Sequence, residues 1–327
     1  MSGALLQVED LHVWFDLPGG RELHAVQGVS FSVAEGARLG LVGESGCGKT
    51  TTILALMGLL PPTASVSGRV LLESEDILAH GERTVAPHRW KDIAMVFQGA
   101  MNAFNPVKRI GDQIAEPILM HGGANRARGM ARVRELLEVV GIARTRATSY
   151  PHELSGGMRQ RAAIAMALAS APRVLLADEP TTALDVMVQA QILELLVELS
   201  DDLGLALVLV THDLPVVAQT CRDAAVMYAG RIVEIGPTDT LYHEPRHPYT
   251  RLLFGATPDL ESRDDVVSIP GVPPRLDAPI AGCPFQPRCD SAFAPCTSSD
   301  PELVTVGDKH AAACHLTTFV AEAAPRS

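Results

Sequence analysis

The sequence predicts an α/β fold in which a mostly parallel sheet carries a glycine-rich loop, followed by a small C-terminal domain rich in proline and cysteine. Continuous apolar runs at residues 174–177 and 205–210 are typical of strands buried on both faces of a parallel sheet. The helical pattern of residues 188–200 between them completes a βαβ unit. From Pro237 onward, 91 residues hold 13 of the 23 prolines and four of the six cysteines, so this tail should be rich in loops.

The remaining elements before the tail follow from hydrophobic patterning. The segments with the pattern of strands are residues 5–13, 22–33, 38–42, 67–72 and 93–97, of which the first two look antiparallel. The segments with helical periodicity are residues 50–60, 111–140 and 156–169. The pair Pro61 and Pro62 stops the first of these helices, and Pro172 follows the last. We place a domain boundary near residues 236–237, which gives domains of residues 1–236 and 237–327.

Composition narrows the class of protein. The chain has 327 residues, 47% of them apolar and 20% charged, which is ordinary for a globular protein of about two domains. The net charge of −11 argues against a nucleic-acid partner, because nucleic-acid binders usually carry a basic face. No apolar run reaches the ~18 residues of a membrane span, and the N-terminus lacks the pattern of a signal peptide. We therefore expect a cytoplasmic chain, whose cysteines do not form structural disulfides.

The strongest chemical signal is a phosphate loop between the strand at residues 38–42 and the helix that follows. It consists of Gly43, Glu44, Ser45, Gly46, Cys47, Gly48, Lys49, Thr50 and Thr51, which fits G-x-x-x-x-G-K-[ST]. Glycines let the backbone wrap closely around phosphate oxygens, and the helix N-terminus adds partial positive charge. Lys49 is expected to neutralise the β- and γ-phosphates, and Thr50 to offer its hydroxyl to Mg²⁺. A redox role for Cys47 is conceivable, but its backbone amide is the part that the loop needs.

Two acids follow the buried strand at residues 174–177. An acid at the carboxyl end of a parallel strand lies at the edge of the sheet where nucleotides bind. Asp178 is therefore predicted to hold Mg²⁺, and Glu179 to orient and polarise the water that attacks the γ-phosphate.

A third signal is the sequence Leu-Ser-Gly-Gly-Met-Arg-Gln at residues 154–160, which opens a helix. Ser155 is first of all a helix N-cap. Gly156 and Gly157, however, lower the stability of a first helical turn. Their presence is explained if another molecule approaches the backbone there. An anion is the obvious candidate.

Together these residues resemble the ABC-type ATPases, a likeness that covers roughly residues 5–237. The resemblance implies a RecA-like core, an antiparallel β subdomain and an α-helical subdomain at about residues 105–170. It further implies that Gln98 belongs to a Q-loop, Asp185 to a D-loop, and that His212 contacts the γ-phosphate. The aromatic residue under the adenine would be Phe15, with Trp14 as the alternative, although the family often has tyrosine there.

In that family two ATPase domains pair head to tail, so each ATP lies between the phosphate loop of one domain and the Leu-Ser-Gly-Gly segment of the other. The resemblance therefore implies that Ser155, Gly156, Gly157 and Asp185 face the ATP of a partner domain. It also implies that Glu179 and His212 are the catalytic residues.

The tail resembles that of the oligopeptide and dipeptide importer ATPases. This likeness rests on Ile-Pro-Gly-Val-Pro-Pro (residues 269–274), Cys-Pro-Phe-Gln-Pro-Arg-Cys (283–289), His-Pro-Tyr-Thr (247–250) and the segments at 181–186 and 188–192. One segment departs from the group, which usually has Asp-Pro where Gly99 and Ala100 stand. That segment helps to contact the membrane subunit, so the departure bears on partner identity.

The four tail cysteines are Cys283, Cys289, Cys296 and Cys314. Four thiolates can hold Zn²⁺ or an iron–sulfur cluster, and the C-x₅-C-x₆-C-x₁₇-C spacing is wider than that of structural zinc sites. His310 and His315 flank Cys314 and keep zinc as an alternative, and four buried free thiols are a third. The resemblance implies a [4Fe–4S] cluster, with a structural role.

The function that follows is an ATP-hydrolysing subunit, at the cytoplasmic face of a bacterial inner membrane, that energises a peptide importer. Two membrane permease subunits, a second ATPase subunit that is identical or homologous, and indirectly a solute-binding protein would be its partners. An importer of nickel or another small solute is the alternative. A non-transport ABC ATPase acting on ribosomes or DNA is disfavoured by the acidic charge and by the lack of a second nucleotide domain.

Overall fold

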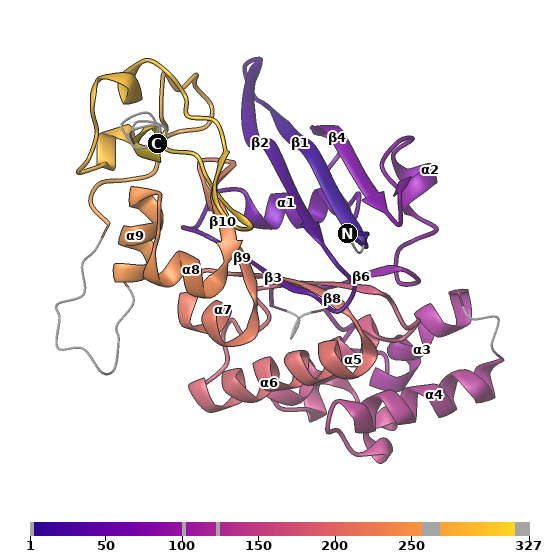
Figure 1. Cartoon of the computed structure of the whole chain (residues 1–327). Coiled ribbons are helices and arrows are strands. Elements are labelled where there is room, and N and C mark those ends of the chain that lie inside the picture. Colours follow the sequence, from indigo (N-terminus) through magenta and orange to yellow (C-terminus); the bar gives the residue numbers. More distant parts are fainter. Residues whose placement is uncertain (1–2, 100–102, 122–124, 257–268, 318–327) are drawn as a thin grey trace. The chain divides into compact units, whose positions relative to one another are not determined.

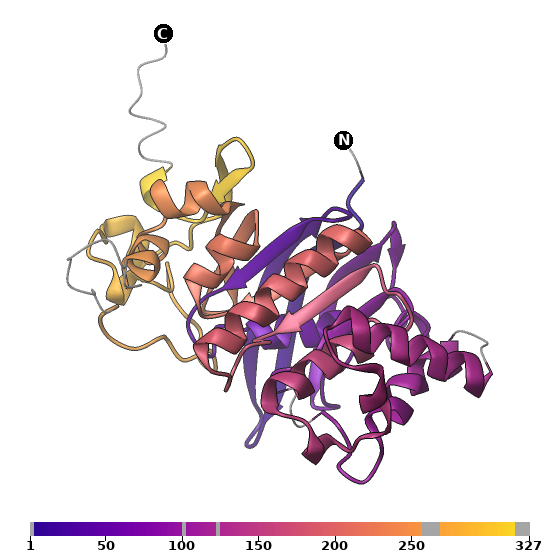
Figure 2. The same ribbon diagram turned by 90° about the horizontal axis from the view of Figure 1, so that it is seen from below.

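The computed structural model describes residues 3–99, 103–121, 125–256 and 269–317. The chain divides into two compact units, each assembled from separated segments. The helical unit comprises Met1–Leu6, Val33–Arg38 and Leu71–Val210. The phosphate-loop unit comprises Gln7–Ser32, Leu39–Val70 and Thr211–Ser327. Figures 1 and 2 show the ribbon from two sides.

The centre of the helical unit is a run of parallel strands, as the apolar pattern predicts. Strand β7 (Val174–Asp178) pairs in parallel with β6 (Ile93–Val96) on one side and with β8 (Ala206–Thr211) on the other. Every residue of all three strands is buried. Helix α6 (Val186–Leu203) connects β7 to β8, which confirms the predicted βαβ unit.

In this unit, side-chain caps precede helices at Asn125, Ser155 and Asp185. Helices α3 (Ile110–His121) and α4 (Arg126–Val139) replace the single predicted stretch at residues 111–140. Helix α5 (Gly156–Ala167) starts after Ser155, whose hydroxyl accepts a hydrogen bond from the Met158 amide at 3.3 Å. In Figure 2, α3, α4 and α5 lie side by side, in agreement with their mutual packing. The minor elements of this unit are β5 (Glu75–Asp76), α2 (Glu82–Val85), and the 3₁₀ turns η2 (Arg144–Thr148) and η3 (Pro151–Glu153).

The phosphate-loop unit contains a sheet near its N-terminus, in which β1 (Leu6–Leu17) lies between β2 (Arg21–Val33) and β4 (Ala64–Leu72) (Figure 1). Residues 18–20 join β1 to β2, and both Gly19 (φ +84°) and Gly20 (φ +72°) adopt the left-handed backbone that such a tight connection uses. Strands β1 and β2 are both longer than the sequence predicts. The apolar alternation ends before the turn, but the backbone pairing continues.

A second sheet in this unit joins the phosphate-loop strand to the tail. The strands that this unit contributes to it follow the order β11 (Val304–Gly307), β12 (His310–Ala312), β10 (Arg231–Pro237), β9 (Asp223–Tyr228) and β3 (Arg38–Val42). Strand β3 has the bounds that the sequence predicts and pairs with β9 in parallel, whereas the other neighbours pair antiparallel. The predicted boundary near residues 236–237 falls at the end of β10, which pairs with tail strand β12. The division into residues 1–236 and 237–327 stays a prediction.

Helix α1 (Lys49–Leu56) is shorter than the predicted span of residues 50–60. Its end is set by Gly58, whose φ of +59° lies in the left-handed region that terminates helices, so the chain leaves the helix before the proline pair. The other helical elements of this unit are α7 (Leu214–Thr220), α8 (Thr238–His243), α9 (Pro248–Gly255), η4 (Gln286–Arg288) and η5 (Ala294–Thr297).

Aromatic side chains form a small core where the tail meets β9. Tyr228, Tyr249 and Phe285 are each at most 1% exposed. The Tyr228 and Tyr249 ring centroids lie 4.6 Å apart, and those of Tyr249 and Phe285 lie 5.4 Å apart. Such pairs stabilise a fold beyond the area that they bury. The tail thus has a packed centre in addition to its loops.

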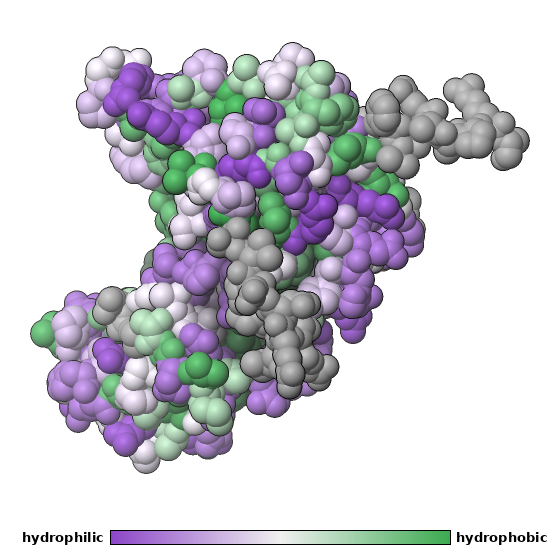
Figure 3. Space-filling view, turned by 90° about the vertical axis from the view of Figure 1, so that its left-hand side faces the viewer, coloured by the Kyte–Doolittle hydropathy of each residue, from purple (hydrophilic) through white to green (hydrophobic). Residues whose placement is uncertain are grey.

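Within the described ranges, no helix combines the length and the apolar character that a membrane span requires. On the face shown in Figure 3, hydrophobic residues are interspersed with hydrophilic ones.

Candidate functional site

The phosphate loop has the geometry that its sequence predicts. It leaves buried strand β3 and leads into α1, whose first turn contains no acidic residue. Gly48 has a φ of +107°, and a Cβ at this position would lie 2.7 Å from the carbonyl oxygen of Ala25. At Gly43, an added Cβ would come within 2.2 Å of the Met227 carbonyl oxygen. Only glycine therefore fits at either position, and the loop presents backbone rather than side chains at a helix N-terminus.

Lys49 points back into the loop. Its side chain is buried, and its Nζ donates to the carbonyl oxygens of Gly43 at 2.7 Å and Glu44 at 3.0 Å. The Cys47 thiol, 3.7 Å from the same Nζ, is buried, and burial raises its pKa. A buried, protonated thiol is a poor nucleophile, which favours the interpretation that Cys47 serves through its backbone.

Glu44 has partners that the sequence does not reveal. Its backbone amide donates to Tyr249 Oη at 2.9 Å, and its carboxylate accepts from Arg288 Nη1 at 2.6 Å and Nη2 at 3.0 Å. The carboxylate also raises the pKa of the Arg288 guanidinium. Tyr249 and Arg288 belong to the His-Pro-Tyr and Cys-Pro-Phe-Gln-Pro-Arg segments, which sequence reasoning used only as a family likeness. No local pattern signals these contacts, because they join residues more than 200 positions apart.

The candidate adenine-stacking residues lie on opposite faces of β1. The Trp14 ring stacks with the rings of both His24, with centroids 4.6 Å apart, and His12, with centroids 5.3 Å apart. Phe15 is half-buried and lies on the opposite face of the strand, because successive side chains of a strand alternate between its faces. Because the Trp14 ring is already engaged by two imidazoles, Phe15 stays the prediction. His212 follows β8 and lies in the phosphate-loop unit, with an exposed side chain.

The predicted carboxylates belong to the helical unit. Asp178 is the last residue of β7 and is 2% exposed. Glu179 follows with a φ of +43°, and its amide donates to the Val210 carbonyl at 2.9 Å. Its Oε2 accepts hydrogen bonds from Gln98 Nε2 at 2.8 Å and from Thr182 Oγ1 at 3.0 Å. The structure thus brings Gln98 and Glu179 together through a direct hydrogen bond. It adds Thr182, which sequence reasoning missed.

The signature segment has a second reason for its glycines. Ser155 caps α5 as predicted and is exposed. A Cβ at Gly157, however, would lie 2.7 Å from Cγ1 of Val188 in α6. Close packing of α5 on α6 therefore requires Gly157, so an approaching anion is not needed to explain it. Asp185 caps α6, because its Oδ1 accepts from the Val188 amide at 3.0 Å. Roles of these residues toward a partner's ATP stay predictions.

The segment that departs from the importer pattern is described only in part. Gly99 has a φ of +66°, whereas residues 100–102 lie outside the described residues.

The tail cysteines lie near one another without forming a single-ion site. All six cysteines of the chain are free thiols. Burial, with smaller contributions from the charges of Cys283, Cys289 and Cys296, raises the pKa of Cys314 to about 11. The Cys283 amide donates to the Cys296 carbonyl at 2.9 Å. Among the residues that the structure describes, no three or more His, Cys, Asp or Glu side chains could hold one metal ion. His310 instead pairs with Glu234 at 2.7 Å, and His315 bonds to Ser299.

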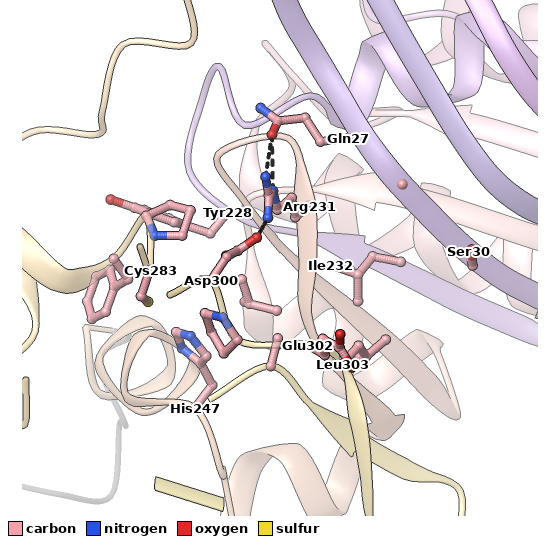
Figure 4. A pocket seen from close by; sticks show the side chains of 16 residues that line it. Gln27, Ser30, Tyr228, Arg231, Ile232, His247, Cys283, Asp300, Glu302 and Leu303 are labelled. Carbon is pink, nitrogen blue, oxygen red and sulfur yellow. Dashed lines mark hydrogen bonds and ion pairs between the residues drawn. The ribbon is translucent and has the colours of Figure 1, made fainter. Parts of the chain in front are cut away.

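A cavity of about 430 Å³ lies within the phosphate-loop unit (Figure 4). Arg231 projects into it, donates to Gln27 Oε1 at 2.8 and 3.0 Å, and pairs with Asp300. None of residues 43–51 lines this cavity, so it is separate from the phosphate loop.

A glycine loop between a buried parallel strand and a helix, with a lysine folded into it, defines a P-loop nucleotide-binding protein of the α/β class. Comparisons with known proteins narrow this class. The family model described as "ABC transporter" matches residues 26–182, and the one described as "Oligopeptide/dipeptide transporter, C-terminal region" matches residues 233–296.

Relatives extend the likeness over most of the chain. The dipeptide transport ATP-binding protein of Bacillus subtilis is 43% identical, over 95% of this chain and 94% of its own length. The oligopeptide transport ATP-binding protein of Salmonella typhimurium is 44% identical, over 92% and 90%. A solved dimeric ATP-binding cassette bound to ADP and phosphate matches with a TM-score of 0.63 and 27% identity, over 71% of this chain and 98% of that one. The chain therefore belongs to the ABC transporter ATP-binding proteins, in the group that carries the oligopeptide/dipeptide C-terminal region.

Proposed function

We propose that this chain is the ATP-hydrolysing subunit of a membrane-embedded importer of oligopeptides or dipeptides. The observation that carries the proposal is the combination, in one chain, of an ABC-type phosphate loop with the C-terminal region of the oligopeptide/dipeptide group. The relatives that share both parts are dipeptide and oligopeptide transport ATP-binding proteins.

The phosphate loop is proposed to bind the ATP triphosphate. Backbone amides of residues 43–51 at the start of α1 would contact phosphate oxygens, and Lys49 would exchange its two carbonyl partners for the β- and γ-phosphates. The loop fits this group because only glycine is accommodated at Gly48, so that backbone rather than a side chain lies at the N-terminus of α1. Thr50 and Asp178 would hold Mg²⁺, which supplies positive charge to the phosphate oxygens. Phe15 would stack on the adenine.

Glu179 is proposed to remove the proton from the attacking water as the water oxygen bonds to the γ-phosphorus, the bond from that phosphorus to the bridging oxygen breaks, and ADP leaves. Support comes from the two hydrogen bonds to Oε2 from Gln98 and Thr182, which fix the orientation of the carboxylate. His212 would contact the γ-phosphate in the same site. Ser155, Gly156, Gly157 and Asp185 would face the ATP bound by a second ATPase subunit, identical or homologous.

The membrane partners are inferred from the group. Because the relatives are transport ATP-binding proteins, two integral permease subunits would form the pore. The chain would act at the cytoplasmic face of the inner membrane, and a solute-binding protein would deliver the peptide from the other side.

The tail cysteines are proposed to bind a [4Fe–4S] cluster through Cys283, Cys289, Cys296 and Cys314. Their mutual electrostatic influence supports a common site, and four sulfur ligands suit a cluster. The C-x₅-C-x₆-C-x₁₇-C spacing is wider than that of structural zinc sites, which favours a cluster over Zn²⁺. Its role would be to hold the loops of the tail together.

The proposed ATPase is tested with Glu179→Gln. The purified variant should bind ATP as the unaltered protein does and hydrolyse it at least about 100-fold more slowly, because general-base catalysis contributes that much or more. Glu198→Gln, an exposed glutamate on α6, is the matched control and should keep full turnover. An unchanged rate in Glu179→Gln would exclude Glu179 as the essential carboxylate.

The proposed substrate is tested in cells. A strain whose copy of this chain carries Lys49→Ala should lose uptake of radiolabelled di- and tripeptides and keep uptake of nickel. Loss of nickel uptake with peptide uptake intact would replace the peptide proposal by the metal-importer alternative.

A further inference from the structure

The tail and the phosphate loop are connected through Glu44. We propose that Arg288 and Tyr249 are positioning residues for ATP binding, which neutralise and immobilise Glu44 inside the phosphate loop. The inference rests on the proposed function, since it requires this loop to bind ATP. It gives the tail a part in nucleotide affinity, in addition to any structural role of its cysteines.

The first step concerns charge. Glu44 places a carboxylate in a loop that must receive a polyanion, and a carboxylate there opposes binding. Arg288 meets both carboxylate oxygens, at 2.6 and 3.0 Å, in the two-pronged geometry that is strongest for an arginine. The Arg288 side chain is 4% exposed and that of Glu44 is 26% exposed, so solvent screens the pair only in part.

The second step concerns the backbone. The Glu44 amide donates to Tyr249 Oη, and the Glu44 carbonyl accepts from Lys49 Nζ. Glu44 is therefore bound by the tail through its amide and bound to Lys49 through its carbonyl oxygen. Because both the peptide group and the side chain of Glu44 are tied, the tail determines where this end of the loop lies relative to Lys49.

The third step concerns rigidity. Arg288 Nε donates to the Pro270 carbonyl at 2.7 Å, and Nη1 also reaches Tyr228 Oη at 3.3 Å. Its guanidinium carbon lies 5.7 Å from the Tyr228 ring centroid and 5.9 Å from that of Phe285. These contacts hold the guanidinium in place through groups that do not belong to the loop. Arg288 is thus fixed before Glu44 meets it, as a positioning residue must be.

The test is a double-mutant cycle between Arg288 and Glu44. Arg288→Gln removes the positive charge and leaves the Glu44 carboxylate unneutralised near the phosphates. For a carboxylate and a phosphate charge separated by roughly 10 Å at an effective dielectric constant of about 20, the repulsion changes the affinity for ATP by on the order of tenfold. We expect Arg288→Gln to raise the Kd for ATP, and the KM, roughly tenfold with little change in kcat.

In the background of Glu44→Gln the same arginine substitution should cost at most about threefold, because no carboxylate remains to be neutralised. Tyr249→Phe keeps the ring and removes one hydrogen bond, so it should raise the Kd a few-fold. Arg275→Gln is the matched control. It removes an exposed tail arginine that pairs with Asp277 and should leave the Kd unchanged.

Thermal unfolding of each variant shows whether it is folded, and the double variant, which has no unpaired charge, guards against misfolding of Arg288→Gln alone. Wild-type affinity in Arg288→Gln, or an equal loss with and without Glu44→Gln, would overturn the inference. Lys49→Ala separates the two proposals: if the unaltered protein binds ATP no better than Lys49→Ala, the proposed function itself is wrong.

Discussion

The imidazole of His247 should make the stability of the tail depend on pH. His247 is buried, and its Nδ1 accepts a hydrogen bond from the Tyr249 amide at 3.0 Å, which caps α9. An amide can only donate, so Nδ1 carries no proton in this arrangement. Protonation would place a charge on a fully buried ring and break the cap. Burial accordingly lowers the pKa of His247 to about 3 from its ordinary value of 6.5.

The sign and size of the effect follow from this difference. Above pH 6.5 His247 is neutral in both the folded and the unfolded chain, so the full stability is present. As the pH falls from 6.5 toward 3, the unfolded chain takes up a proton that the folded chain refuses, and stability is lost. Each pH unit in this window costs about 1.4 kcal/mol, so the free energy of unfolding should fall by about 2 kcal/mol between pH 7 and pH 5.

The assay compares the free energy of unfolding of the unaltered protein and of His247→Asn in urea at pH 7 and pH 5. Unfolding is monitored by the near-ultraviolet circular dichroism of the tyrosines. Asparagine can cap the helix but does not titrate. Carboxylates contribute equally to both proteins, so the difference between them isolates His247. If both proteins lose the same free energy over this range, the argument from burial of His247 is wrong.

Two further predictions concern the tail. Glu234 is fully buried, accepts hydrogen bonds from the amides of Arg246 and His247, and pairs with His310. Glu234→Ala should therefore lower the free energy of unfolding, measured by urea unfolding, by about 3–5 kcal/mol. A loss below about 1 kcal/mol would contradict this prediction. Anaerobically purified protein should contain iron and acid-labile sulfide in equal amounts, about four of each per chain, and chelation of the iron should destabilise the tail. Zinc without sulfide would refute the cluster.

Local signals in the sequence predict the parts of the fold that depend on neighbouring residues. Strand β3 and the start of α5 lie where the apolar runs and the Ser155 cap indicate, because burial and capping act within a few residues. The phosphate loop is predictable because its residues recur at fixed spacing between a strand and a helix. The reason that Gly43 must be glycine is a long-range one, since an added Cβ would lie 2.2 Å from the Met227 carbonyl oxygen.

Long-range contacts are the part that sequence reasoning missed. The pairing of β3 with β9 joins Leu39 to Asp223, and the ion pair of Glu44 with Arg288 spans 244 positions. Neither has a local pattern, because each depends on how distant segments pack. Gly157 has a packing role that sequence reasoning did not include. Its predicted ligand contact stays a prediction, and the structure adds that helix packing against Val188 also requires a glycine there.

The segment order of the two units has a consequence for synthesis on the ribosome. All segments of the helical unit have been made by Val210, whereas the phosphate-loop unit still lacks Thr211–Ser327. Those missing residues include Met227, whose carbonyl lies against Gly43, and Gly230, whose amide donates to the Cys47 carbonyl at 3.0 Å. A nascent chain therefore contains the complete phosphate-loop sequence long before the residues that pack against the loop have been synthesised. Because contacts between distant segments form late, nucleotide capture should report that the second half of the chain has emerged and folded.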